Sequence, residues 1–270
     1  MSDPGDGGDL WERNAGWWQE CFTEGADPEY EEQILPLVAE LLDGSTRVLD
    51  VGCGEGQIGR LAAQTRGVRL VVGVDPTRAQ LQEATRRGGG VLLGRAEAAL
   101  LPFYPGSFDA VVACLVFEHV AALDEAISEV GRVLVPGGRF LLLLNHPLLQ
   151  APGSGWVDDR ILDEQYWRIG PYLVEDSSLE EVDKGVWVPF IHRPLSRYVN
   201  AMAAAAMYVT RMEEPSPPAG FLARAAEYRE AATIPRLLVL RAEKLPAASS
   251  TGRTGRSSRR RQVPTAGGKM

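Results

Sequence analysis

This 270-residue sequence is poor in the side chains that cross-link a chain or bind metals. It has three cysteines, Cys21, Cys53 and Cys114, which are too few and too scattered for a disulfide framework. None of them has the paired spacing of a zinc site. We therefore expect reduced thiols, as in a cytoplasm, and the sequence indicates no metal site.

Long apolar runs are also missing. No stretch approaches the roughly 20 residues that a membrane-spanning helix requires. The first nine residues are acidic and rich in glycine, without the basic and apolar regions of a signal peptide. We expect a cytoplasmic protein without a membrane span. With 45% hydrophobic residues, the chain can bury the core of one large α/β domain.

Acidic residues are absent from the last 25 positions, which carry six basic residues. The other 22 basic and 36 acidic residues give the rest of the chain a formal charge of −14. Residues 246–270 are rich in Ser, Thr, Gly, Ala and Arg, and such a composition predicts a disordered basic tail. Because the acidic body would repel a phosphate backbone, we do not expect nucleic-acid binding.

An apolar run that ends in alternating glycines is the most informative feature. Residues 48–51 predict a buried strand, and Gly52, Gly54 and Gly56 follow it. Glycines at alternate positions allow a tight turn with positive φ and let a ligand approach the main chain. Residues 57–64 then predict the start of a helix. The whole stretch predicts a strand that runs into a nucleoside-binding loop.

Strands and helices alternate along the rest of the chain. Asp27 and Pro28 favour the start of a helix that reaches Leu42, with Pro36 as a kink. Apolar runs predict strands at 48–51, 70–74, 91–93, 108–114 and 139–145, and a final antiparallel pair at 207–212 and 235–242. Further helices are predicted at 77–87, 123–134 and 195–206. Such alternation indicates a parallel sheet with its ligand-binding loops at the carboxyl ends of the strands.

These motifs together resemble the class I S-adenosylmethionine-dependent methyltransferases, over residues 45–145. The resemblance rests on the glycine loop, on Asp75 after the second strand, on the segment Gly94–Glu97 and on the turn Pro136-Gly137-Gly138. It is strongest to the small-molecule branch that includes ubiquinone and menaquinone biosynthesis enzymes. It implies an α/β, Rossmann-like three-layer sandwich, whose seven-stranded, mostly parallel sheet has one antiparallel strand.

The resemblance also assigns the cofactor, S-adenosylmethionine, to particular residues. Gly52, Cys53, Gly54 and Gly56 would line its methionine half, with Asp50 near the amino end. Asp75 would accept hydrogen bonds from both ribose hydroxyls, a task suited to a carboxylate, and Pro76 would lie against the adenine. Other positions on the cofactor side are Ala96, Glu97 and Cys114. The family usually has aspartate where this chain has Arg95, which cannot accept a hydrogen bond and which we expect at the solvent or beside an acid.

Methyl transfer to a hydroxyl or a carbon acid needs a base, and a histidine suits that role. The chain has three histidines, all predicted at the ligand-binding edge or its cover. We predict His146 as the base. His119 either acts as a base or simply caps a local turn, with Glu118 as a further alternative. His192, Arg193 and Tyr198 are predicted on the substrate side, where Arg193 could hold an anionic acceptor or form a structural salt bridge.

These assignments divide the chain into five parts. Residues 1–44 form an N-terminal helical segment that covers the cofactor side, and 45–148 form the cofactor-binding core. Residues 149–194, rich in aromatic and acidic side chains, form a substrate cap; 195–245 add the last helix and strands, and 246–270 are the tail. We interpret Trp11, Trp17 and Trp18 as packing residues, with a lid over the cofactor as the alternative.

The function predicted is methylation of a small molecule at oxygen or carbon. An NAD(P)-dependent oxidoreductase is the first alternative, but the dinucleotide fingerprint places glycine where this chain has Gln57. A methyltransferase-like binding module without activity is the second alternative. The sequence indicates neither the acceptor nor the oligomeric state.

Overall fold

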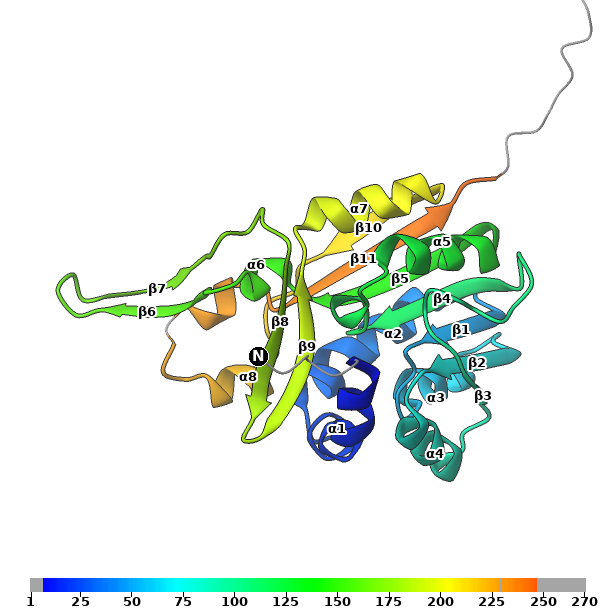
Figure 1. Ribbon diagram of the computed structural model, residues 1–270, viewed down its shortest axis with the longest axis horizontal. Helices are drawn as coiled ribbons and strands as arrows, with labels where there is room; N and C mark the ends of the chain where they lie inside the picture. Colours follow the sequence, from blue (N-terminus) through cyan, green and yellow to red (C-terminus); the bar gives the residue numbers. More distant parts are fainter. Residues whose placement is uncertain (1–6, 229, 247–270) are drawn as a thin grey trace, which may run out of the picture.

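A computed structural model describes residues 7–228 and 230–246, so the predicted tail lies almost wholly outside the described residues. Its centre is a seven-stranded sheet in the order β10-β11-β5-β4-β1-β2-β3 (Figure 1). Strand β11 is antiparallel to both of its neighbours, and the other pairs are parallel. The fold predicted from the resemblance is confirmed. The strands are β1 (Arg47–Val51), β2 (Leu70–Asp75), β3 (Leu92–Arg95), β4 (Phe108–Cys114), β5 (Leu134–Asn145), β10 (Met207–Glu213) and β11 (Leu237–Lys244).

Helices cover both faces of the sheet. One face packs against α5 (Leu123–Val133) and α7 (Leu195–Ala204), and the other against α2 (Leu35–Leu41) and α3 (Gln57–Gln64). The remaining helical segments are α1 (Gly7–Phe22), η1 (Tyr30–Ile34), α4 (Arg78–Arg87), η2 (Phe117–His119), α6 (Pro147–Gln150), α8 (Ala219–Arg224) and η3 (Ala231–Thr233). No helix of the described residues has the length and apolar content to cross a membrane.

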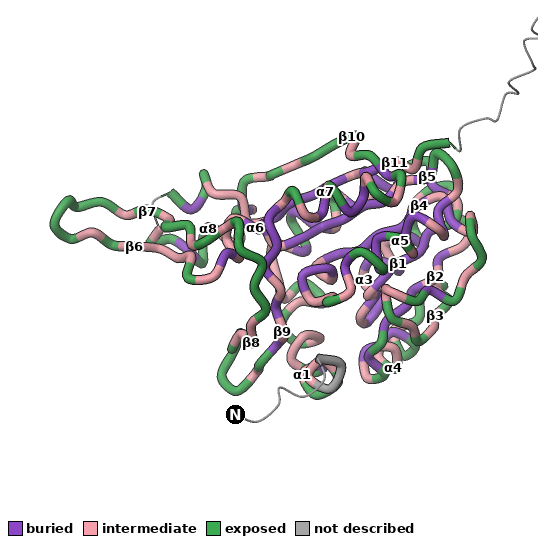
Figure 2. The backbone as a smooth tube through the Cα atoms, turned by 45° about the horizontal axis from the view of Figure 1, so that its top comes forward, coloured by how far each residue is buried: buried purple, intermediate pink, exposed green. Residues whose placement is uncertain are grey.

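Strand β5 shows how one continuous apolar run serves both layers. Phe140, Leu142 and Leu144 pack on the α5 and α7 side, while Leu141 and Leu143 pack on the α2 and α3 side. Successive side chains of a strand point to opposite faces, so a strand covered on both faces needs an unbroken apolar sequence. Figure 2 shows this buried centre in purple.

The N-terminal part contains two differences from the sequence prediction. The tryptophan segment is a separate helix, α1, within residues 1–44, for which the sequence predicted helical structure but gave bounds only for the helix that reaches Leu42. The predicted kink at Pro36 is a π turn over η1, in which the N–H of Leu35 donates to the carbonyl of Tyr30. Because proline has no N–H to continue the regular ladder, the irregular turn immediately before it costs little.

The predicted cap consists of two antiparallel hairpins. Strands β6 (Gly155–Asp159) and β7 (Glu164–Arg168) form the first, and β8 (Asp176–Asp183) and β9 (Val186–His192) form the second. The β6–β7 hairpin extends away from the sheet, whereas β8–β9 lies beside α1 (Figure 1). The two halves of the cap therefore have different surroundings.

The chain changes direction across the sheet between β1 and β4. The crossover from β1 leads to β2 on one side, while β4 pairs with the other side of β1. In open α/β sheets, ligands bind outside the carboxyl ends of the strands at such a switch point. The glycine loop after β1 and the segment after β4 meet there.

Candidate active site

A cavity of about 720 Å³ lies at the carboxyl ends of β1, β2 and β4. This volume is within the range of about 300–1,000 Å³ typical of small-molecule sites. We call one part the glycine-loop end; it is lined by Asp50, residues 52–55, residues 75–78, residues 95–99 and residues 114–116. We call the other part the aromatic end; it is lined by Trp11, Trp18, Phe22, Tyr30, His119, Val120, Ser177, Pro189 and Ile191.

The glycine loop is fixed by β2. The N–H groups of Gly52 and Cys53 both donate to the carbonyl of Val74, at 2.8 and 3.0 Å. A Cβ on Gly52 would lie 2.5 Å from a methyl group of Val116, so this position must be glycine. Gly54 has φ of 52° and nothing within 4 Å of an added Cβ, which leaves its main chain open to the cavity.

Asp75 connects the loop to the start of α4. Its Oδ2 accepts from the N–H of Gly54 at 2.9 Å, and its Oδ1 accepts from the N–H of Thr77 at 2.8 Å. Burial raises the pKa of Asp75, while these backbone hydrogen bonds act in the opposite direction. Each carboxylate oxygen can accept a further hydrogen bond, so Asp75 can still receive the two hydroxyls predicted for it.

Asp50 is a buried carboxyl at the end of β1, with 1% of its surface exposed. Its Oδ2 has no hydrogen-bond partner among the described residues. Burial raises the pKa of Asp50 to about 7, and the neighbouring charge of Asp75 adds to the effect. The backbone of Gly59 and the charge of Arg60 act in the opposite direction on this pKa. A buried carboxyl with one oxygen still unpaired at a cavity is a natural partner for a cationic ligand group.

Arg95 lies at the solvent, one of its two predicted surroundings, and is exposed. Its guanidinium Nε donates to the carbonyl of Pro76 at 2.8 Å. The side chain lines the cavity together with Ala96 and Glu97. The backbone N–H of Ala96 donates to the carbonyl of Asp75 at 3.3 Å. Arg95 therefore connects the end of β3 to the segment after β2.

Neither of the cysteines near the loop is suited to be a nucleophile. Burial raises the pKa of both the Cys53 and the Cys114 thiol. Cys53 packs so closely on β2 that a Cβ on Gly73 would lie 2.9 Å from its Sγ. Cys114 lies at the end of β4, with its Sγ 3.9 Å from the hydroxyl of Tyr30. Both thiols serve as small buried side chains.

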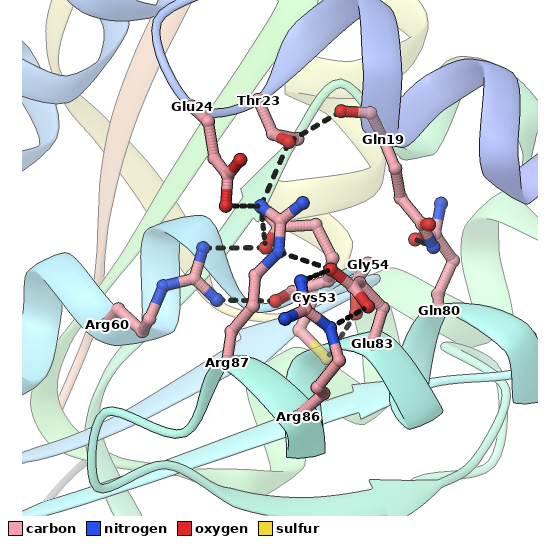
Figure 3. Close-up of polar contacts among 11 residues, drawn as sticks. Gln19, Thr23, Glu24, Cys53, Gly54, Arg60, Gln80, Glu83, Arg86 and Arg87 are labelled. Atoms are coloured by element: carbon pink, nitrogen blue, oxygen red, sulfur yellow. Dashed lines mark hydrogen bonds and ion pairs between the residues drawn. The ribbon is translucent and has the colours of Figure 1, made fainter.

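An ion-pair network joins the glycine loop to α3 and α4 (Figure 3), and the sequence did not predict it. Glu55 is 2% exposed, and its Oε2 accepts from Arg60 at 2.6 Å and from Arg87 at 2.9 Å. Arg87 also donates to the hydroxyl of Thr23, just after α1, at 2.9 Å. Arg87 thus connects the glycine loop, α4 and the end of α1.

Helix α1 is docked on the same side by two further contacts. The carboxylate of Glu12 accepts from the backbone N–H groups of Arg78 and Ala79, and the side chain of Gln19 donates to Gln80 at 3.0 Å. On its other flank, Asn14 donates to the carbonyl of Trp187 at 2.7 Å. Helix α1 therefore lies between α4 and β9 and forms a wall of the cavity.

His119 is the histidine that lines the cavity. Its Nδ1 lies 2.6 Å from the carbonyl oxygen of Pro189, and its ring makes edge contacts with Trp11 and Phe190. A carbonyl oxygen can only accept, so Nδ1 carries the hydrogen and Nε2 carries the lone pair. Burial lowers the pKa of His119 to about 4, and the ring is neutral at pH 7.

His146, the predicted base, is held elsewhere. It is not among the residues that line the cavity. Its Nδ1 accepts from the N–H of Leu148 at 3.1 Å as the cap of α6, and its Nε2 lies 2.8 Å from Glu214. Both ring nitrogens are therefore engaged by protein groups, and the role of His146 as the base stays a prediction.

The predicted substrate-side residues are buried. His192, Arg193 and Tyr198 are not among its lining residues. The Nε2 of His192 bonds the carbonyl of Tyr172 at 2.8 Å, and Tyr198 lies in the core beside α5. Arg193 donates to backbone carbonyls of the segment 117–121 and lies 3.8 Å from Glu175. Of the two predicted roles for Arg193, the geometry favours the structural one.

The Trp, Phe and Tyr side chains of the aromatic end come from the N-terminal segment, while the predicted cap supplies Ser177, Pro189 and Ile191. The cavity is not lined by Trp156, Tyr166, Trp167, Tyr172 or Trp187. Trp11, Ala15, Trp18 and Phe22 recur at the three- and four-residue spacing of one helix face. This spacing in the sequence indicates where α1 lies within the predicted helical segment and which of its faces lines the cavity.

Comparisons with known proteins agree with this geometry. A family described as a methyltransferase domain matches residues 49–142. The chain is 38% identical, over 134 residues, to the ubiquinone/menaquinone biosynthesis C-methyltransferase UbiE of Methylobacterium nodulans, covering 47% of this chain and 51% of the relative. It is 28% identical to the 27-O-demethylrifamycin SV methyltransferase of Amycolatopsis mediterranei, covering 65% of this chain and 71% of the relative.

The solved structures give the same result. The S-adenosylmethionine-dependent methyltransferase from Mesorhizobium loti superposes with a TM-score of 0.66 at 28% identity, covering 77% of this chain and 96% of that one. Among the curated relatives, the chain spans about half the length of the ubiquinone/menaquinone and demethylmenaquinone enzymes it matches, between 41% and 57%.

Proposed function

We propose that this chain, in which residues 49–142 match a methyltransferase domain, is a class I S-adenosylmethionine-dependent methyltransferase that methylates a small organic acceptor at oxygen or carbon. Relatives with C-methyltransferase and O-methyltransferase in their names support both outcomes. The bound cofactor supplies an electrophilic methyl group on a positively charged sulfur. The chain's own residues must hold that cofactor, orient the acceptor and accept a proton.

The glycine-loop end fits S-adenosylmethionine on three features of this structure. The unpaired, buried Oδ2 of Asp50 suits the amino group of the methionine half. The open main chain at Gly54 leaves room for a ligand against the loop. Asp75 has acceptor capacity left for two ribose hydroxyls. Residues Arg95 to Glu97 would then border the adenine, with Arg95 already engaged on Pro76.

On the acceptor side, we propose His119 as the group that accepts the proton. It lies in the same cavity as the glycine loop, and its neutral ring presents Nε2 as a hydrogen-bond acceptor. In this role Nε2 accepts the proton that the acceptor's O–H or acidic C–H loses, while Pro189 holds the Nδ1–H tautomer. Glu118, the alternative base, is less well placed because it is buried outside the cavity and accepts from Asn145.

The lining of the aromatic end selects the kind of acceptor. Trp11, Trp18, Phe22, Tyr30 and Ile191 provide flat or apolar surfaces, and Ser177 adds a hydroxyl. Arg193, predicted either to hold an anion there or to form a structural salt bridge, donates to backbone carbonyls. The proposal is therefore an uncharged acceptor with an apolar body. It places the reaction in the cytoplasm, which the three unpaired cysteines support.

The proposal is tested in two steps. Calorimetry with S-adenosylhomocysteine first measures cofactor binding, and absence of binding at millimolar product refutes the cofactor assignment. A panel of uncharged aromatic alcohols is then assayed with S-adenosylmethionine labelled in the methyl group. Label transferred by the wild type and lost in His119→Gln supports the proposal. Transfer that is equal in both proteins refutes the role of His119.

A further inference from the structure

We propose that Arg193 is a positioning residue, whose guanidinium holds the segment 117–121 so that His119 faces the cavity. This proposal rests on the role of His119 proposed above. In this role Arg193 does not bind an anion but holds the main chain around His119 in place. Nothing in it requires Arg193 to touch the cofactor or the acceptor.

The contacts of Arg193 surround His119 on both sides along the chain. Its Nη1 donates to the carbonyl of Phe117 at 3.1 Å, two residues before His119. Its Nη2 donates to the carbonyls of Val120 and Ala121, at 2.8 and 3.1 Å, directly after His119. The side chain is 4% exposed, so these bonds are shielded from water. One residue thus fixes the main chain at three points of a five-residue segment.

Strand β9 supplies a second hold on the same histidine. Pro189 lies four positions before Arg193 on the chain, and its carbonyl accepts from Nδ1 of His119. The arginine therefore fixes the backbone, and the proline carbonyl fixes the ring and its tautomer. From the opposite side, the N–H and the side chain of Asn145 donate to Glu118 at 3.2 and 3.1 Å. The loop is held by β9 and by β5 together.

The chemistry of these contacts requires arginine. A guanidinium has five N–H donors in a rigid plane and can reach several carbonyls at once. A lysine ammonium has three donors at a single point, and its strong hydration opposes burial. Both hydrogens of Nη2 are used on carbonyls, and the Nε side faces Glu175 at 3.8 Å. Arg193→Lys keeps the charge but cannot reproduce the pattern.

The chain offers a matched control in the first turn of α7. Arg197 also contacts Glu175, at 3.3 Å, but its other partner is Asp124 and not the 117–121 segment. Arg197→Lys therefore disturbs the same glutamate and leaves His119 alone. Comparing the two lysine variants separates positioning from a general loss of charge around Glu175.

The test uses the full chain with its three histidines labelled with ¹⁵N in the ring. The signal of His119 is assigned with His119→Gln, and the ring nitrogen shifts report which nitrogen carries the hydrogen. The wild type and Arg197→Lys are expected to show the Nδ1–H tautomer. Arg193→Lys is expected to show an average of both tautomers and a pKa that moves toward the ordinary value of about 6.5. An unchanged Nδ1–H signal in Arg193→Lys refutes the proposal.

Turnover gives a second readout once an acceptor is known. Arg193→Lys should lower kcat by about 10- to 100-fold, because small misplacements of a reacting group have effects of that size. The KM for S-adenosylmethionine should stay within about twofold, since the glycine-loop end is untouched. A raised acceptor KM with unchanged kcat would instead show direct acceptor binding, and would overturn positioning. If no methyl transfer occurs at all, the proposed function fails while the ¹⁵N result still decides the role of Arg193.

Folding is checked by circular dichroism and by S-adenosylhomocysteine affinity. If Arg193→Lys does not fold, the wild type alone decides, through the guanidinium N–H signals of Arg193. Separate, slowly rotating N–H signals are expected from a guanidinium bonded to three carbonyls. Averaged signals, which indicate free rotation, would overturn the proposal.

Discussion

The carboxylate of Glu12 caps a helix to which it does not belong. Its Oε2 and Oε1 accept from the first backbone N–H groups of α4, at Arg78 and Ala79, with distances of 2.7 and 3.0 Å. Thr77, the N-cap residue of α4 itself, makes no side-chain cap. A negative charge at a helix start satisfies free N–H groups and opposes the positive end of the helix dipole. The cap therefore holds α1 against the edge of the cofactor site.

We predict that Glu12→Ala loosens α1 and weakens cofactor binding. Loss of an exposed cap should cost about 0.5–1 kcal/mol in the free energy of unfolding. The affinity for S-adenosylhomocysteine, measured by calorimetry, should fall severalfold because α1 borders the site. Glu20→Ala, on the exposed face of the same helix, is the control. Equal binding losses in both variants would contradict a specific role for the cap.

Asp50 should make cofactor binding depend on pH. Its pKa of about 7 in the free protein should fall when the positive groups of S-adenosylmethionine arrive, because opposite charge favours the carboxylate. Binding near pH 7 should therefore release protons, and affinity should rise with pH until the free carboxyl is fully ionised. Calorimetry in buffers of different ionisation heat measures this release. Asp50→Asn should remove it, and a release that persists would assign the proton to another group.

The same residue has a consequence for stability. Its pKa in the folded state lies above the ordinary value of about 3.9, so the unfolded state holds fewer protons between pH 4 and pH 7. Stability should therefore fall as pH rises through this range. Urea unfolding should show this slope in the wild type and a shallower one in Asp50→Asn. Parallel pH profiles of the two proteins would contradict the raised pKa.

Asp75→Asn should separate cofactor binding from folding. The amide replaces one acceptor oxygen by a donor, which must then face the N–H of Gly54 or Thr77 or the ribose. Affinity for S-adenosylhomocysteine should fall at least about 10-fold, or about 1.4 kcal/mol. Asp109→Asn is the control, since Asp109 also accepts from backbone N–H groups, at Thr46 and Arg47, but next to the start of β1. The control should lose stability and keep its affinity.

The two histidines should behave oppositely on substitution. His119→Gln should lower turnover by about 10²–10⁴-fold, the usual contribution of a general base, with cofactor affinity little changed. His146→Ala removes the cap of α6 and the contact with Glu214, so it should cost about 1–2 kcal/mol of stability. For both variants, unfolding curves measure the change in stability and initial rates of methyl transfer measure the change in turnover. Lost turnover in a stable His146→Ala protein would return the base to the position predicted from sequence.

The sequence predicted the centre of the sheet well because its central strands are apolar on both faces. The apolar run at residues 139–145 predicts a strand buried between two layers. The glycine loop also follows an apolar strand. The side-chain roles were harder, because they depend on where the loops converge in space. His146 follows β5 directly and so was predicted at the ligand edge, yet its ring is fixed by Leu148 and Glu214.

The aromatic end shows the other limit of sequence interpretation. The aromatic stretch at residues 150–189 lies in the segment that we predicted as the substrate cap. Trp156 instead pairs with Trp167 and stacks on Tyr228, outside the cavity. No local pattern tells whether a hairpin folds toward the site or away from it. The spacing of Trp11, Trp18 and Phe22 did carry information, but only the contacts of α1 with α4 and β9 show which surface that helix faces.

The contact between Asn14 and Trp187 spans 173 positions of the chain. The glycine-loop end is built from residues 50–116, whereas the aromatic end needs β9 to return to α1. During synthesis, residues 50–116 emerge from the ribosome long before β9, which completes the aromatic end of the cavity. Closing so long a loop is slow relative to local pairing. A growing chain should therefore acquire a cofactor cradle first and become competent to discriminate acceptors only after the ribosome has passed β9.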